Sequence, residues 1–205
     1  MRHSAAREWA LTIRSGPLVI LMDFVVQFSY LAKMIQLNEP SNKLISSYLD
    51  FIEEMNSLGE TVWEGMLPKP METTQAFVTR ILRRQSHPEA GLVPETTCWA
   101  TRGNEVVGRI SLRHSLNDNL KEYGGHIGYE VRPSARRQGI AKEMLRKVLQ
   151  TPRARQIGHL LLTCAPDNIA SNKTILANGG VLEKTAFVAK WNRDTHYYWI
   201  HLSES

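Results

Sequence analysis

The spacing of apolar residues divides the chain from Met34 onward into a series of strands and helices. Apolar side chains recur every three or four positions, as on a helix with one buried face, at 44–55, 73–85, 140–149 and 169–178. Alternating or short apolar runs predict strands at 35–37, 96–101, 106–113, 125–131, 159–164, 181–188 and 196–201. The order β-α-α-β-β-β-α-β-α-β-β predicts an α/β domain built on a mixed sheet with helices on both faces.

Residues 1–33 differ from the rest of the chain. The segment 17–32 is apolar, but it carries Asp23 near its centre. It is shorter than the roughly 20 residues that span a bilayer, and no small-x-small cleavage site follows it. We therefore predict an N-terminal extension over 1–33, either a non-native start preceding translation from Met34 or a helix packed on the domain. The folded domain is predicted over 34–205, with no membrane partner.

Composition and charge narrow the class of protein. Cys98 and Cys164 are far apart and form no CxxC pair, so a disulfide framework or a cysteine-based metal site is disfavoured. A reducing cytoplasm is the expected location, and no metal is expected. The net charge of +5 includes a cluster of basic residues over 132–147. A cluster this local suits a small polyanion, not the long basic stripe of a nucleic-acid binder.

That basic cluster lies between a strand and a helix. The segment 131–145 runs from a strand through a proline turn to two arginines, a short loop and a helix. The first amide groups of a helix lack partners and bind anions, and Gly139 lets the backbone approach a phosphate closely. A diphosphate site is predicted over Arg136, Arg137, Gln138, Gly139, Ile140, Ala141 and Lys142.

This segment resembles the acetyl-CoA cradle of the GNAT superfamily of N-acetyltransferases. The cradle reads (Arg/Gln)-x-x-Gly-x-(Gly/Ala), which Arg136, Gly139 and Ala141 satisfy. The resemblance continues through Asn168-x-x-Ser171, and the order of elements fits over 34–202. It implies a mostly antiparallel central sheet flanked by helices, in which parallel strands 4 and 5 splay apart.

The resemblance also implies an activity and a donor site. The chain would transfer an acetyl group from acetyl-CoA to a primary amine of a small molecule or peptide by direct attack. Backbone groups of Tyr129 and Val131 would pair with the pantetheine arm, and Asn168 and Ser171 would complete the site. A homodimer is compatible with this interpretation. The alternative is a catalytically silent acyl-CoA-binding domain.

No motif as distinct as the cradle identifies the catalytic and acceptor-binding residues. Many family members carry a tyrosine acid seven residues after the asparagine, where this chain has Ile175. Its role would therefore fall to solvent or to a different residue, for which Tyr198 and Tyr197 are the candidates. Glu130 and His126 are the candidate bases, because they share one face of a strand beside the expected acetyl position. For a cationic acceptor, the loop between the first two helices offers Glu60, Trp63 and Glu64.

Overall fold

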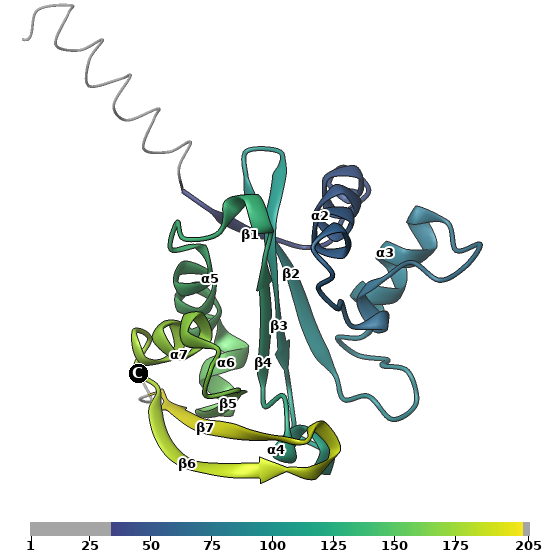
Figure 1. Ribbon diagram of the computed structural model, residues 1–205. Helices are drawn as coiled ribbons and strands as arrows, with labels where there is room; N and C mark the ends of the chain where they lie inside the picture. The colour runs from purple at the N-terminus through teal and green to yellow at the C-terminus, as the bar shows by residue number, and fades with distance from the viewer. Residues whose placement is uncertain (1–33, 203–205) are drawn as a thin grey trace, which may run out of the picture. The chain divides into compact units, whose positions relative to one another are not determined.

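The computed structural model describes residues 34–202 of the chain (Figure 1). The predictions made for 1–33 therefore lie outside the described residues. Among the described residues the strands are β1 (Gln36–Asn38), β2 (Glu95–Arg102), β3 (Glu105–Arg113), β4 (Ile127–Val131), β5 (His159–Cys164), β6 (Val181–Val188) and β7 (Arg193–His201). The helices are α2 (Ile45–Ser57), α3 (Thr74–Arg83), α4 (Asp118–Glu122), α5 (Ile140–Leu149), α6 (Pro152–Ile157) and α7 (Ile169–Leu176), with single 3-10 turns at Glu64–Met66, Pro133–Ala135 and Ala189–Trp191.

Four of the described helices, α3, α4, α6 and α7, begin where a side chain accepts a hydrogen bond from one of their free amides. Thr73 and Asn168 accept hydrogen bonds from the third residue after them, and so cap α3 and α7. Like α2, α5 has no side-chain cap; it begins at Ile140, directly after Gly139. Its first amide groups are therefore left for another acceptor.

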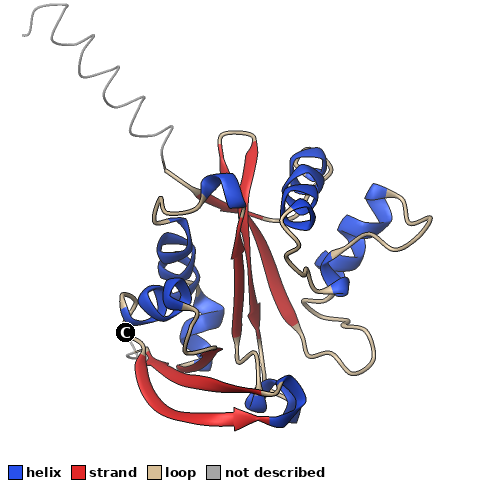
Figure 2. Ribbon diagram, viewed as in Figure 1, coloured by secondary structure: helices blue, strands red, loops and turns tan. Residues whose placement is uncertain are grey.

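The strands form two antiparallel ladders. One has the order β1-β2-β3-β4 and the other the order β5-β7-β6, and every paired strand in them is antiparallel. Helices cover both faces: α2 contacts β3 from one side and α5 contacts β3 and β4 from the other (Figure 2). The predicted α/β arrangement of mostly antiparallel strands flanked by helices is confirmed, with the strands divided between two ladders.

The two ladders meet where β4 and β5 approach each other. The amide N–H of His126 donates to the carbonyl of Leu161 at 2.7 Å, and the Leu161 N–H donates to Nδ1 of His126 at 2.9 Å. Gly125 makes this approach possible, because a Cβ on it would overlap the Leu161 carbonyl oxygen. Beyond this contact β4 and β5 form no ladder among the described residues, and a gap opens between their C-terminal ends.

Two apolar cores lie on opposite faces of the sheet. The larger packs α5 against β3, β4 and β5 and includes Met144, Leu145 and Leu160, all with 0% exposure. The smaller packs α2 and α3 against β2 around Tyr48 and Trp99, whose rings stack at 4.2 Å. Consecutive residues of a strand point to opposite faces, so neighbouring residues of β4 face different cores.

The sequence did not predict α4 and α6. They have five and six residues, too few to show a helical repeat of apolar positions. In the described part of the chain, no helix combines the length and apolar character that crossing a membrane requires. Over the same residues, no cluster of three or more His, Cys, Asp or Glu side chains is arranged to hold a metal ion. Both cysteines are free thiols.

Candidate functional site

One cavity among the described residues follows the open edge of β4. It has a volume of about 540 Å³ and is bounded by the end of β4, the turn after it, the first turn of α5 and the start of α7. Strand, turn and helix are the three parts that the sequence predicted for an anion site. The cavity therefore coincides with the predicted cradle.

The backbone of the turn before α5 is shaped to bind an anion. Arg137 and Gly139 both have positive φ angles, 60° and 77°. Left-handed residues alternating with ordinary ones turn successive N–H groups toward one point, and the uncapped amides of α5 add to them. Nothing lies within 4 Å of the position a Gly139 Cβ would take, so the space beside this backbone is open.

Most of the residues predicted to bind the donor line this cavity. They are Tyr129, Val131, Arg136, Arg137, Gly139, Ile140, Ala141, Lys142, Asn168 and Ser171. Gln138 is the exception: its side-chain oxygen accepts a hydrogen bond from Arg102 at 2.8 Å, outside the cavity. Gln138 thus ties the turn to β2.

A second cavity, of about 420 Å³, occupies the gap between β4 and β5. Its charged lining residues are Arg113, Glu130, Asp167 and Arg193. Four residues line both cavities: Tyr129, Glu130, Asn168 and Ser171. Two molecules entering by the two cavities would therefore meet at these four side chains.

A pair of hydroxyl groups lies at this junction. The Tyr129 hydroxyl and the Ser171 Oγ are 2.9 Å apart, which links β4 to α7. Burial raises the pKa of Tyr129 to about 12, so the phenol keeps its proton at neutral pH. Ile175 follows one turn later on α7 with 1% exposure. The junction therefore holds a protonated hydroxyl although α7 has no tyrosine there.

Glu130 faces the opposite side of β4 from Tyr129. Both of its oxygens accept from Arg109, at 2.7 and 3.0 Å, and Arg109 also donates to the Tyr48 hydroxyl at 3.1 Å. Arg109 is 2% exposed, whereas the Glu130 side chain is 36% exposed. The Glu130 carboxylate is thus held in place at the junction, and the buried Arg109 guanidinium neutralises its charge.

His126 and Tyr198 lie outside both cavities. Burial, with a smaller contribution from the Arg113 charge, lowers the pKa of His126 to about 4, and its Nδ1 is occupied by the Leu161 amide. The Tyr198 hydroxyl donates to Oδ1 of Asn172 at 2.5 Å. Neither side chain is placed to act on a substrate, and both instead support the strands and the loop after β5.

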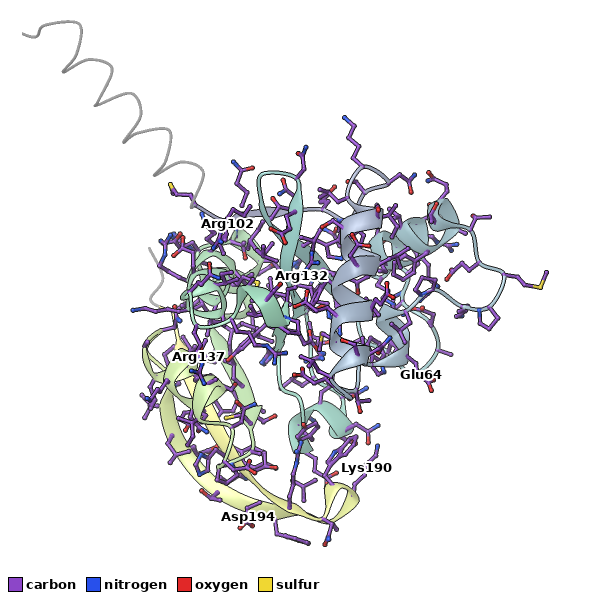
Figure 3. The ribbon with its side chains drawn as sticks, turned by 45° about the horizontal axis from the view of Figure 1, so that its top comes forward. Glu64, Arg102, Arg132, Arg137, Lys190 and Asp194 are labelled. Carbon is purple, nitrogen blue, oxygen red and sulfur yellow. The ribbon has the colours of Figure 1, made fainter. Side chains whose placement is uncertain are left out.

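The three predicted acceptor residues do not line the second cavity. Glu60 lines the first cavity, where it binds Arg136. The Trp63 ring lies under the Arg84 guanidinium, 5.0 Å from it. Glu64 begins the 3-10 turn after this loop and lies on the α2–α3 side of the molecule, away from Arg137 (Figure 3). The loop between α2 and α3 thus forms no joint acceptor site here.

Sequence reasoning assigned no role to several charged residues of the second cavity. Arg113 ends β3, Asp167 follows β5 and Arg193 begins β7, so they are distant in the sequence. Arg109 was also missed, because a charged residue inside an apolar strand has no motif of its own. Its position among apolar neighbours in 106–112 was the available signal, since a buried arginine requires an acid nearby.

Comparisons with known proteins agree with this geometry. Residues 46–181 match the family model described as an acetyltransferase (GNAT) domain. The sequence finds no match among curated proteins. The solved structure of the microcin C7 self-immunity acetyltransferase MccE, in complex with acetyl-CoA and AMP, is similar with 19% identity and a TM-score of 0.60, covering 82% of this chain and 92% of that one.

Two ribosomal-protein acetyltransferases are also similar in structure. RimL, a ribosomal L7/L12 α-N-protein acetyltransferase in complex with coenzyme A, has 21% identity and a TM-score of 0.61, covering 82% of this chain and 94% of RimL. The Salmonella typhimurium enzyme that modifies the N-terminal serine of L7/L12 has 20% identity and a TM-score of 0.58, covering 84% and 98%. At such identities these likenesses support the fold.

Proposed function

This chain belongs to the GNAT family of acetyltransferases, and from that premise we propose that its larger cavity binds acetyl-CoA while an amine acceptor enters by the second cavity. The protein is an acetyl-CoA-dependent N-acetyltransferase. The observation that carries the site assignment is the uncapped, left-handed turn at Arg137 and Gly139, which opens into the cavity.

The residues of the cavity fit the donor. The amides from Arg137 to Lys142 would hold the diphosphate, with the Arg137 and Lys142 side chains adding positive charge. Val131 ends the unpaired edge of β4, whose backbone would bind the pantetheine arm as a further strand. When bound there, acetyl-CoA supplies the thioester whose acetyl group is transferred.

The residues shared by both cavities would carry the chemistry. We assign to the Tyr129 hydroxyl, oriented by Ser171, the role of donating a hydrogen bond and a proton to the departing sulfur. Water in the second cavity would return a proton to the phenolate, so that the released CoA carries the thiol proton. Glu130 would attract the acceptor's ammonium group to the junction. Because Arg109 already occupies both its oxygens, we do not assign Glu130 the role of base; the ammonium proton would pass to water in the second cavity.

For the acceptor, two classes of amine are proposed. The second cavity is open and carries both acidic and basic side chains, which suits a small amine or the N-terminus of a peptide. RimL acts on the N-terminus of a ribosomal protein, and this supports including peptides in a test.

The donor site can be tested by titrating acetyl-CoA into the wild-type protein and a Gly139→Trp variant. The new side chain would fill the open space beside the cradle, so binding should be lost. Gly91→Trp is the matched control, because Gly91 also has a positive φ and open surroundings but lies outside both cavities. Normal binding by the Gly139→Trp variant would contradict the site. Release of CoA with amino acids, polyamines, aminoglycosides and N-terminal peptides would then identify the acceptor.

A further inference from the structure

An ion pair lies in the lining of the larger cavity. The Arg136 guanidinium donates to both oxygens of Glu60, at 2.5 and 2.6 Å, and its Nε donates to the Val131 carbonyl at 3.1 Å. Both side chains line the cavity. Glu60 lies in the segment 58–63 between α2 and the following 3-10 turn, and Arg136 is the first residue of the cradle. The Glu60 carboxylate therefore already accepts the hydrogen bonds that the Arg136 guanidinium could donate to a bound diphosphate.

This pair opposes a bound diphosphate. The hydrogen bond from Arg136 lowers the pKa of Glu60, so the carboxylate is ionised at neutral pH. An entering anion would meet both an occupied guanidinium and a like charge. The Arg136 and Glu60 side chains are 39% and 35% exposed, and ion pairs this accessible to water are weak enough to exchange. A diphosphate can thus displace the carboxylate.

A neighbouring pair joins α2 to the turn after β4, outside the cavity. Glu54, on α2, binds Nε of Arg132 at 2.6 Å, Oγ of Ser134 at 3.1 Å and the Ser134 amide N–H. It does not line the larger cavity. The Arg132 and Glu54 side chains are 17% and 24% exposed. This contact would keep α2 on the turn after the Glu60 pair has opened.

We propose that Glu60 is an internal competitor of the acetyl-CoA diphosphate for Arg136, and that donor binding releases the segment 58–63 from the cradle. The inference rests on the proposed donor site. CoA carries the same diphosphate, so return of Glu60 to Arg136 also favours release of the product. The pair thus lowers affinity for the donor while preventing the product from remaining bound.

The test is a calorimetric titration of acetyl-CoA and of CoA into the wild-type protein, E60Q and the matched control E54Q. Glutamine keeps the shape of the side chain and removes the charge. E60Q should bind both ligands about three- to five-fold more tightly, which is the upper part of the range that an exposed ion pair allows. E54Q should stay within about two-fold of wild type, since its pair lies outside the cavity. E60A also removes the negative charge of Glu60 and so provides a second, independent variant, which should bind both ligands more tightly as well.

Hydrogen exchange of the segment 58–63 supplies an independent measurement. Saturating acetyl-CoA should increase exchange there in the wild type, whereas in E60Q the segment should exchange fast with or without ligand. Unchanged or weaker binding by E60Q and E60A would overturn the inference while leaving the donor site intact. Absence of acetyl-CoA binding by wild type and E60Q alike would overturn the donor site and the inference together.

Discussion

The hydroxyl groups of Tyr129 and Ser171 are 2.9 Å apart and join β4 to α7 where the two cavities meet. Ser171 lies on α7 one turn before Ile175, where the resemblance to the GNAT family leads one to expect a tyrosine. The phenol of Tyr129 reaches the same helix from the opposite wall. The hydroxyl that α7 lacks at Ile175 is thus supplied by Tyr129 of β4. The hydrogen bond with Ser171 restricts the orientation of the Tyr129 hydroxyl.

Replacing Tyr129 with phenylalanine should lower kcat by about 100-fold, at the low end of the effect of a positioned acid, with little change in the Kd for acetyl-CoA. Ser171→Ala should lower kcat less, because the phenol remains. The double variant should be no slower than Tyr129→Phe, since Ser171 acts through Tyr129. Steady-state release of CoA measures all three.

Tyr197→Phe is the matched control for this series. Tyr197 is also largely buried, but its hydroxyl donates to the Glu122 carbonyl at 2.5 Å and it lines neither cavity. Its removal should leave kcat unchanged. A Tyr129→Phe enzyme with wild-type kcat would exclude the phenol as the proton donor.

The Glu130→Gln variant should be less stable as well as less active. The charge of Arg109 is buried at 2% exposure and would lose its counter-ion. We expect a decrease of about 2 kcal/mol in the free energy of unfolding, below the 3–5 typical of fully buried pairs, because Glu130 is 36% exposed. Urea denaturation measures this decrease, and activity should be compared only at temperatures where both proteins are folded.

Glu143→Gln serves as the control for Glu130→Gln. Glu143 pairs with Arg146 one turn along the exposed face of α5. Its loss should leave the urea midpoint unchanged. If Glu130→Gln were as stable as wild type, the buried charge of Arg109 would not depend on Glu130 as its counter-ion.

The periodic parts of the fold could be predicted from the sequence. Each of α2, α3 and α5 buries one apolar stripe, so its spacing of apolar residues is regular. The gap between β4 and β5 could not be derived from spacing, because it depends on the contact of Gly125 with Leu161 across the two ladders. It was expected only through the family resemblance.

The candidate site was likewise predictable from the sequence only in part. The cradle is contiguous in the sequence, and its positive φ angles at Arg137 and Gly139 belong to one short turn. Glu130 and His126 share a strand face, so the sequence predicts both as candidate bases and does not distinguish them. Their surroundings separate them: His126 is pinned to Leu161, whereas Glu130 meets Arg109. Such partners come from distant strands and leave no local signal.

A chain that begins at Met34 should fold and bind acetyl-CoA with wild-type affinity. Ile35 is buried in the larger core at 4% exposure, and β1 pairs with β2 directly after it. These contacts are retained when residues 1–33 are removed. Thermal melting and calorimetry check the outcome. A shortened chain that aggregates would instead assign residues 1–33 to the folded core.

Burial of His126 should make stability depend on pH. Its pKa is lowered to about 4, against about 6.5 in an unfolded chain. Between these values the unfolded state binds more protons than the folded state, so stability rises with pH and is lost as pH falls. The full difference corresponds to roughly 3 kcal/mol, developed from about pH 6.5 down to pH 4.

The matched variant is His126→Asn, whose amide oxygen can still accept from the Leu161 N–H but which does not titrate. Carboxylates such as Glu72 and Glu89, with pKa values near 2, also lose stabilising contacts in acid. They do so equally in both proteins and mainly below pH 4.5. The difference in unfolding free energy between wild type and variant should therefore change in favour of the variant as pH falls from 6.5 to 4. A difference that stays constant over this range would show that His126 is not held neutral at the contact between the ladders.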